Sequence, residues 1–132
     1  MTLLITLIIA AITYGTPLLF GTLGEILTEK SGNLNLGVEG IMFMGGALGL
    51  GGVYYYEKLS SSPNGFVAIL VGIFFAFLAG AIASLIFSFL TITLRANQNV
   101  TGLALTTFGM GVANFFGVFI LNGASYSAAP IA

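Results

Sequence analysis

The sequence predicts an all-α membrane protein in which about four helices cross the bilayer. Of its 132 residues, 58% are hydrophobic and only 5% are charged, whereas a soluble domain carries roughly 25% charged residues. The mean hydropathy is +1.10, and a soluble fold of this size would leave too much of that apolar surface in water. The composition therefore requires a lipid bilayer around the chain.

The scarcity of charged and reactive side chains excludes several classes of function. The chain contains no Cys, His or Trp, which removes disulfides, thiol chemistry, histidine bases and ordinary zinc or haem sites. Lys30, Lys58 and Arg95 lie far apart, so no basic patch for nucleic acid can be assembled. No nucleophile–base pair and no nucleotide-binding glycine pattern is present. We expect no enzymatic activity, no metal, no cofactor and no nucleic-acid partner.

Four apolar runs supply the predicted crossings. Each is close to the roughly 20 residues that a helix needs to span about 30 Å of hydrocarbon. The runs cover residues 3–27, 35–56, 66–94 and 100–121. The last two are separated by a polar turn at 95–99, and the third is long enough to tilt or to project from the bilayer.

Small and hydroxyl-bearing residues share one face of the first run, because they recur at intervals of three and four. We expect this face to pack against protein. Pro17 removes a backbone hydrogen bond, which predicts a kink between Thr13 and Pro17, with Thr13 or Thr16 satisfying the freed carbonyl. The face comprises Thr6, Ala10, Thr13, Pro17, Gly21 and Gly24.

The second helix is expected to begin after Asn35, a residue well suited to be its N-cap. Gly45, Gly49 and Gly52 then lie within about 60° of one another on a helical wheel and predict a groove for close helix packing. Glu39 lies roughly a third of a turn away from that groove. It should therefore face a different neighbour.

The remaining runs carry small residues at every fourth position, which predicts tight helix packing. Between the second and third runs, residues 60–65 form the clearest loop, and the tyrosines at 54–56 just before it suit an interfacial anchor. The small-residue rows are Gly72, Ala76, Gly80, Ser84 and Ser88 in the third run, and Gly109, Ala113 and Gly117 in the fourth.

The three basic residues give a prediction of orientation. The turns at Lys30 and Arg95 are separated by an even number of crossings and so share one side, while Lys58 lies on the other. Because basic residues favour the cytoplasm, the first two turns are expected there and the N-terminus outside.

Six polar residues in or next to the two turns are candidates for a substrate path. Glu39 is the one ionisable residue that helix periodicity places inside a crossing, where a carboxyl group must pair, face water or take up a proton. Its alternative role is structural, since the dipole of the second helix favours a carboxylate in the first turn. The amides offer donors and acceptors suited to a neutral polyhydroxylated solute, or they simply cap helices. The amides are Asn33, Asn35, Asn97, Gln98 and Asn99.

Two motifs carry a resemblance to a known family. The run GEILTEKSGNLNLGVEGIMFMGG at 24–46 and the run TLRANQNVTGLALTTFGMGVANFFG at 93–117 resemble the membrane permease subunits of bacterial ABC importers for nucleosides and simple sugars, in the same order and at a similar distance. This superfamily also includes the permeases for branched-chain amino acids and ribose. The resemblance covers essentially the whole chain, residues 1–132, as a single transmembrane permease domain. It matches the N-terminal part of a permease that is typically more than twice as long.

The resemblance implies a subunit of the bacterial plasma membrane that performs no chemistry itself. Its partners would be a second permease subunit, a cytoplasmic ABC ATPase and an extracytoplasmic lipoprotein that binds the solute. The segments 31–39 and 97–102 would be interrupted or re-entrant stretches that border the translocation path, and their amides would meet the solute.

Two other readings remain open. The helix count and Glu39 also suit a small homo-oligomeric exporter in which this carboxyl group alternately binds protons and a cationic substrate. That reading favours aromatic neighbours around Glu39, whereas Gly37, Val38, Gly40 and Ile41 surround it. The small-residue rows would also suit a membrane scaffold that does not transport.

Overall fold

A computed structural model describes residues 2–125, and these residues fold into helices joined by short connections. Across this range no strand is present, which confirms the all-α prediction. The elements are α1 Thr2–Lys30, α2 Val38–Leu59, α3 Gly65–Ser88, the π-helical turn η1 Phe89–Thr93 and α4 Gln98–Ser125.

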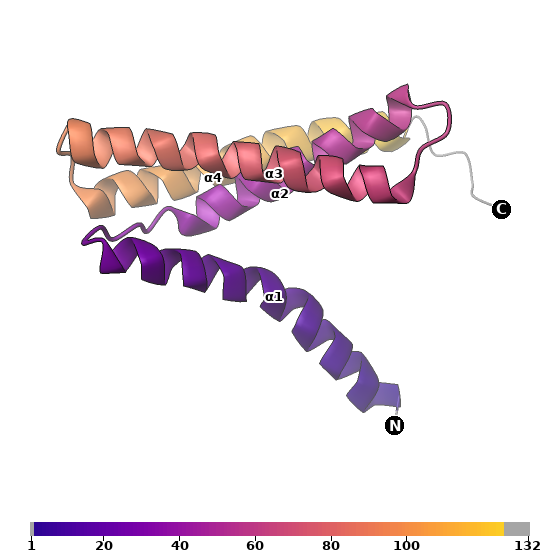
Figure 1. The fold of residues 1–132 in the computed structure, drawn as a ribbon, viewed down its shortest axis with the longest axis horizontal. Helices are drawn as coiled ribbons and strands as arrows, with labels where there is room; N and C mark the ends of the chain where they lie inside the picture. The colour runs from indigo at the N-terminus through magenta and orange to yellow at the C-terminus, as the bar shows by residue number, and fades with distance from the viewer. Residues whose placement is uncertain (1, 126–132) are drawn as a thin grey trace.

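Within the residues that the structure describes, three helical stretches are long and apolar enough to cross a membrane: Thr2–Lys30, Gly65–Thr93 and Gln98–Ile120. The second predicted run also forms a helix, and its 22 residues extend about 33 Å. It is not among the candidate membrane spans, and its residues include six glycines, three tyrosines and the charged Glu39, Glu57 and Lys58. It packs against both α3 and α4, which shield it on two sides (Figure 1).

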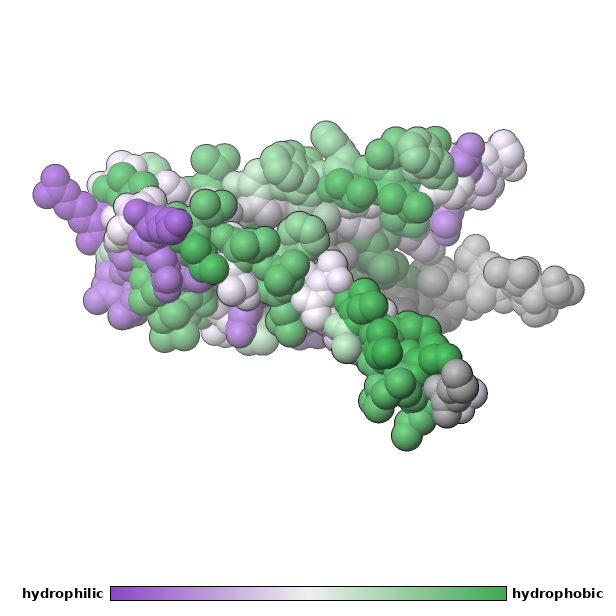
Figure 2. Space-filling model, turned by 60° about the horizontal axis from the view of Figure 1, so that its bottom comes forward, coloured by the Kyte–Doolittle hydropathy of each residue, from purple (hydrophilic) through white to green (hydrophobic). Residues whose placement is uncertain are grey.

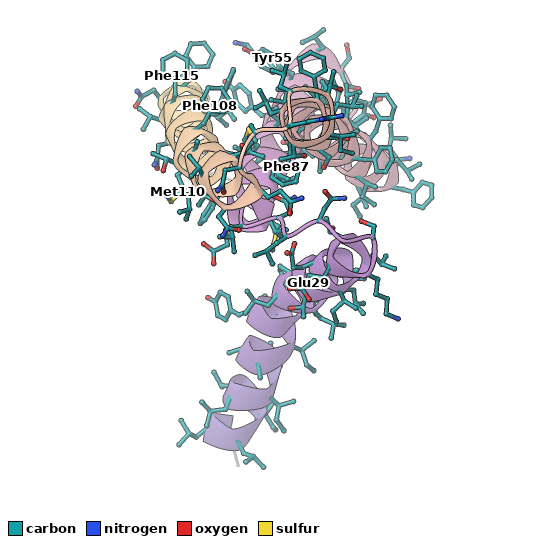
Figure 3. The ribbon with its side chains drawn as sticks, turned by 90° about the vertical axis from the view of Figure 1, so that its left-hand side faces the viewer. Glu29, Tyr55, Phe87, Phe108, Met110 and Phe115 are labelled. Atoms are coloured by element: carbon teal, nitrogen blue, oxygen red, sulfur yellow. The ribbon has the colours of Figure 1, made fainter. Side chains whose placement is uncertain are left out.

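The helices α2, α3 and α4 form one packed bundle, and α1 diverges from it (Figure 1). The core of the bundle contains Met44, Ala83, Phe87 and Leu105. Phe87 lies among the three helices, whereas Phe115 points away from them (Figure 3). No residue of α1 is buried, and its free end presents an almost continuous apolar surface (Figure 2).

Glycines bring the bundle helices into backbone contact. A Cβ atom on Gly109 of α4 would overlap the backbone of Gly40 in α2. On the other side of α2, a Cβ on Gly49 would lie 3.0 Å from the carbonyl oxygen of Gly72. The predicted packing groove of α2 is thus confirmed, because a Cβ on Gly52 would also lie 2.6 Å from the ring of Phe75 in α3.

Within the described residues, the small-residue face of α1 meets protein only near Gly21, so protein contact along the rest of this face stays a prediction. Only Gly21 has a tight neighbour, with its Cβ position 2.6 Å from Sδ of Met42, while Thr6 and Thr13 are exposed. The rest of this face has no partner among the described residues, because α1 leaves the bundle beyond its contact with α2. The predicted kink agrees with the bend of α1 near its middle (Figure 1).

The hydroxyl groups next to the kink do not act as predicted. Pro17 lacks the N–H that would bond the carbonyl oxygen of Thr13. The Thr13 hydroxyl instead donates to the carbonyl oxygen of Ile9 at 2.8 Å, and the Thr16 hydroxyl donates to that of Ile12 at 2.6 Å. Each threonine bonds one turn back along its own helix, as such side chains commonly do.

Two element boundaries also differ from prediction. The N-cap of α2 is Gly37. Asn35 lies three residues before the helix begins, and its side-chain oxygen accepts the hydrogen bond of the Gly37 N–H. The α-helix of the third run ends at Ser88 and continues as the π-helical turn, whose last hydrogen bonds reach from Leu94 back to Phe89. The loop at 60–64 lies between α2 and α3 as predicted, with Asn64 capping α3.

The connection between α1 and α2 and the connection between α3 and α4 lie at the same end of the molecule (Figure 1). The α2–α3 loop lies at the opposite end. The shared side that was predicted for the Lys30 and Arg95 turns is therefore confirmed, and it places two polar segments next to each other.

Candidate functional site

Gln98 joins the two polar turns. Its side-chain oxygen accepts a hydrogen bond from the backbone N–H of Leu34 at 2.9 Å, and its side-chain nitrogen donates to Oδ1 of Asn33 at 3.0 Å. One amide thus bonds both a backbone group and another amide of the opposite turn. Gln98 begins α4, so this pair fixes the start of α4 against the segment that precedes α2.

Asn35 is the most enclosed residue of the first turn, with 7% of its surface exposed. Its side-chain oxygen accepts from the backbone N–H of Gly37 at 2.9 Å. Its own backbone N–H donates to Oε1 of Glu25 at 3.0 Å, which ties the turn to α1. Asn35 therefore directs the chain from α1 into α2.

A close approach between α4 and the first turn completes the junction. A Cβ on Gly102 would lie 2.8 Å from the backbone nitrogen of Leu36, so only glycine fits this position without movement. The hydroxyl of Thr106 donates to the carbonyl oxygen of Leu36 at 2.7 Å. Neither Thr106 nor Glu25 is among the six predicted site residues. Their signal in the sequence is weak, because a threonine or a glutamate near a helix end has many ordinary uses.

Asn97 and Asn99, on either side of Gln98, are both exposed but differ in their hydrogen bonds. Oδ1 of Asn97 accepts from the backbone N–H groups of Asn99 and Val100, at 3.0 and 3.3 Å. This is the hydrogen-bond pattern of an N-cap, so Asn97 holds the first turn of α4. The Asn99 side chain is exposed. Just before them, Arg95 has a φ of 53°, which closes the turn after η1.

Glu25 carries an unusual carboxyl group. Its Oε1 atom accepts the hydrogen bond from Asn35, but Oε2 is buried and has no hydrogen-bond partner among the described residues. Burying an oxygen without a hydrogen bond costs free energy. The hydrogen bond between Oε1 and the Asn35 N–H offsets part of that cost.

A groove of about 390 Å³ opens beside the junction, between α1, α2 and α4. This volume is in the range of small-molecule sites. We call it the junction groove. Glu39 is exposed in the first turn of α2 and contributes to its wall, and Glu29 lies between α1 and the other helices (Figure 3). The polar lining consists of Glu25, Glu29, Asn35, Glu39 and Thr106.

The structure thus brings Asn33, Asn35 and Gln98 together, places Glu39 in the adjacent groove, and leaves Asn97 and Asn99 at the start of α4. Within residues 2–125, no group of three or more His, Cys, Asp or Glu side chains is arranged to hold a metal ion. The arrangement offers amide, hydroxyl and carboxylate groups around an accessible space. It can bind polar solutes by hydrogen bonds.

Comparison with known proteins gives a consistent result. Residues 7–130 match the family described as branched-chain amino acid transport system, permease component. A Haloferax volcanii protein whose name assigns it to glucose ABC transporter permeases, TsgC13, is 37% identical over 108 residues, which cover 82% of this chain and 30% of that protein.

Two bacterial relatives are named for nucleoside transport. The guanosine ABC transporter permease protein NupQ of Bacillus subtilis is 30% identical over 92% of this chain and 37% of its own length. The nucleoside ABC transporter permease protein NupC of Lactococcus lactis is 31% identical over 83% of this chain and 32% of its own length. The chain thus spans about a third of the length of these curated relatives. No solved structure matches it significantly.

Proposed function

This chain belongs to the permease-component family of branched-chain amino acid transport systems, and from that premise we propose that it forms part of the membrane-spanning subunit of an ATP-driven importer for nucleosides or simple sugars. The relatives named for guanosine, nucleoside and glucose transport support this solute range. The three apolar helical spans support a location in the membrane.

The proposal includes the assembly. Residues 1–132 act as one multi-pass domain in the plasma membrane and pair with a second permease subunit. Hydrolysis of ATP takes place on a separate cytoplasmic ABC ATPase, and an extracytoplasmic lipoprotein delivers the solute. The turns at Lys30 and Arg95 face the cytoplasm.

The polar junction beside the junction groove carries the proposal. Nucleosides and sugars present several hydroxyl groups, which amides and carboxylates bind without any need for a net charge on the solute. We assign two roles to the six predicted residues. Asn33, Asn35, Asn97 and Gln98 shape the wall of the path through their mutual and backbone hydrogen bonds, while Glu39 and Asn99 have exposed side chains that can meet the solute.

The test is uptake of radiolabelled guanosine, uridine, glucose and ribose into cells that lack their own carriers for these solutes. The chain is expressed alone and together with the remaining permease sequence, the ATPase and the lipoprotein of its own transport system. Uptake of a nucleoside or sugar only by the complete set supports the proposal. Uptake of none of them by a complete and correctly inserted set contradicts it.

The matched substitutions are Glu39→Gln and Glu57→Gln. Both change one exposed carboxylate of α2, but Glu39 lies in the junction groove and Glu57 near the opposite end of the helix. We expect several-fold slower uptake for Glu39→Gln and unchanged uptake for Glu57→Gln. Equal uptake by the two variants would remove Glu39 from the path. Transport by the chain alone that a protonophore abolishes would instead favour the exporter.

A further inference from the structure

A second and larger groove lies on the other side of the contact between α1 and α2. Its volume is about 750 Å³, and α1, α2 and α3 all contribute to its lining. We call it the α1 groove. It is separate from the junction groove, although Asn35 and Val38 border both.

Three of the five glycines that line the α1 groove, Gly24, Gly46 and Gly80, have no close neighbour within the described residues, whereas Gly21 and Gly45 do. A Cβ on Gly24 or Gly46 would meet nothing within 4 Å, and a Cβ on Gly80 would meet only Ile41, at 3.8 Å. Gly40 and Gly109 differ from these glycines, because their backbones lie in direct contact with each other. Glycine weakens a helix and is favoured in membranes where another helix approaches closely. Three helices thus present small residues to one empty space.

Polar groups in the α1 groove argue against lipid as its occupant. Ser84 of α3 is exposed there and is the polar group that most needs a partner. Asn35 and Thr28 also contribute to the lining, but the Thr28 hydroxyl already donates to the carbonyl oxygen of Gly24, and the Asn35 side-chain oxygen accepts from the N–H of Gly37. Acyl chains offer no hydrogen-bond donor or acceptor, so polar groups at membrane depth are normally covered by protein. A helix with a hydroxyl or amide side chain can meet both the glycines and these groups.

The relatives show that a permease of this family has further chain to supply such a helix. Roughly two thirds of each named relative has no counterpart in this chain. Over its 29 residues α1 has no buried side chain, so one of its faces is available to that additional sequence.

From these observations we propose that the α1 groove receives a membrane-spanning helix from the part of the permease fold that this chain does not match. This inference rests on the proposed function in one respect, which is that the partner helix belongs to a permease. The occupant carries small residues where it passes Gly24 and Gly80, and a hydrogen-bonding side chain near Ser84.

Site-specific crosslinking tests this assignment. The chain has no natural cysteine, so Ser84→Cys and Leu85→Cys each introduce a unique thiol on α3. Ser84 lies in the α1 groove, whereas Leu85 is 69% exposed and outside it. Each variant is made in cells that express the chain naturally, labelled in membranes with benzophenone maleimide and irradiated. The adducts are identified by mass spectrometry.

We expect Ser84→Cys to crosslink to a peptide of permease sequence. This peptide should align with the part of the relatives that the present chain does not match, and it should be recovered several-fold more often than from Leu85→Cys. Thr28→Cys and Leu27→Cys repeat the comparison from α1, in case the α3 variants insert poorly. Lipid adducts alone at both positions of a pair, a peptide from a second copy of this chain, or one from an unrelated protein would each overturn the proposal. Because crosslinking needs no solute, it separates failure of this inference from failure of transport.

Discussion

The interface between α2 and α4 and the interface between α1 and α2 both contain glycines, but only the first is closed. Gly109 lies against the backbone of Gly40, so two helices meet without an intervening side chain. In α1, a Cβ on Gly21 would meet the flexible end of Met42, and a Cβ on Gly24 would meet nothing within 4 Å. The spacing of glycines therefore shows where a helix can be approached. Whether a neighbour is present depends on the rest of the fold.

The largest expected effect comes from filling the closed interface. Gly109→Leu should destabilise the bundle by about 3 kcal/mol or more, because overpacking against a backbone cannot be relieved by a rotamer change. The matched control is Gly111→Leu on the same helix, whose added Cβ meets nothing within 4 Å. The measurement is the midpoint of SDS-induced unfolding followed by circular dichroism. Equal midpoints for the two variants would contradict the close crossing.

A smaller effect is expected where α1 is tied to the first turn. Glu25→Leu removes the acceptor of the Asn35 N–H, and an unsatisfied buried donor costs about 1–3 kcal/mol. Glu25→Gln keeps a side-chain oxygen and should restore most of that loss. The measurement is hydrogen exchange at the Asn35 amide, which should be faster in the leucine variant. If both variants exchange at the same rate, Glu25 does not hold the turn.

Loss of the cap on α4 should have an effect of about 1 kcal/mol. Asn97→Ala removes the acceptor for two backbone N–H groups, a change that typically costs about 0.5–2 kcal/mol. Asn99→Ala is the control, since this exposed side chain accepts none of those bonds. Protease cleavage at residues 94–98 in detergent should accelerate only for Asn97→Ala. Faster cleavage in both variants would indicate a general loosening of the turn.

The smallest effect is expected for Gly24→Ala, which should be stabilising in the chain alone and destabilising for its association with the remaining permease sequence. In the chain alone, Gly24→Ala should stabilise α1 by up to about 1 kcal/mol, the difference in helix propensity. With the remaining permease sequence present, the same methyl group should weaken association of the two parts, because it enters the α1 groove. The measurement is recovery of that sequence by affinity purification, compared with Leu27→Ala on the lipid-facing side. Stronger or equal recovery would show that the groove is not closed by a helix.

The positions of the helices could be predicted from the sequence, because apolar runs and polar turns determine where a membrane helix can exist. Three of the four runs agree with the helical spans that satisfy length and hydropathy, and the fourth agrees with α2. The exact ends were less predictable. Asn35 has the chemistry of an N-cap, but its oxygen bonds Gly37, and the helix begins one residue later.

The candidate site was predicted as a list of residues and not as an arrangement. Hydrogen bonding within each turn follows from local spacing, as for Asn97 and the start of α4. The link from Gln98 to Asn33 joins residues far apart in sequence, and no periodicity relates them. Their role as a substrate path stays a prediction, and the structure adds Glu25, Gly102 and Thr106 to the set that should be varied.

The contact between Gly40 and Gly109 also has a mechanical consequence. Gly109 is the midpoint of the apolar span Gln98–Ile120, so about 16 Å of helix extends from it in each direction. Because this contact involves backbone alone, a tilt of α4 about it would displace no side chain at the crossing itself, but it would strain the hydrogen bonds that hold Gln98 to Asn33 and Leu34. Any tilt of α4 about this point moves Gln98 and Ile120 in opposite directions. Such a tilt would widen one end of the α2–α4 pair as it narrows the other.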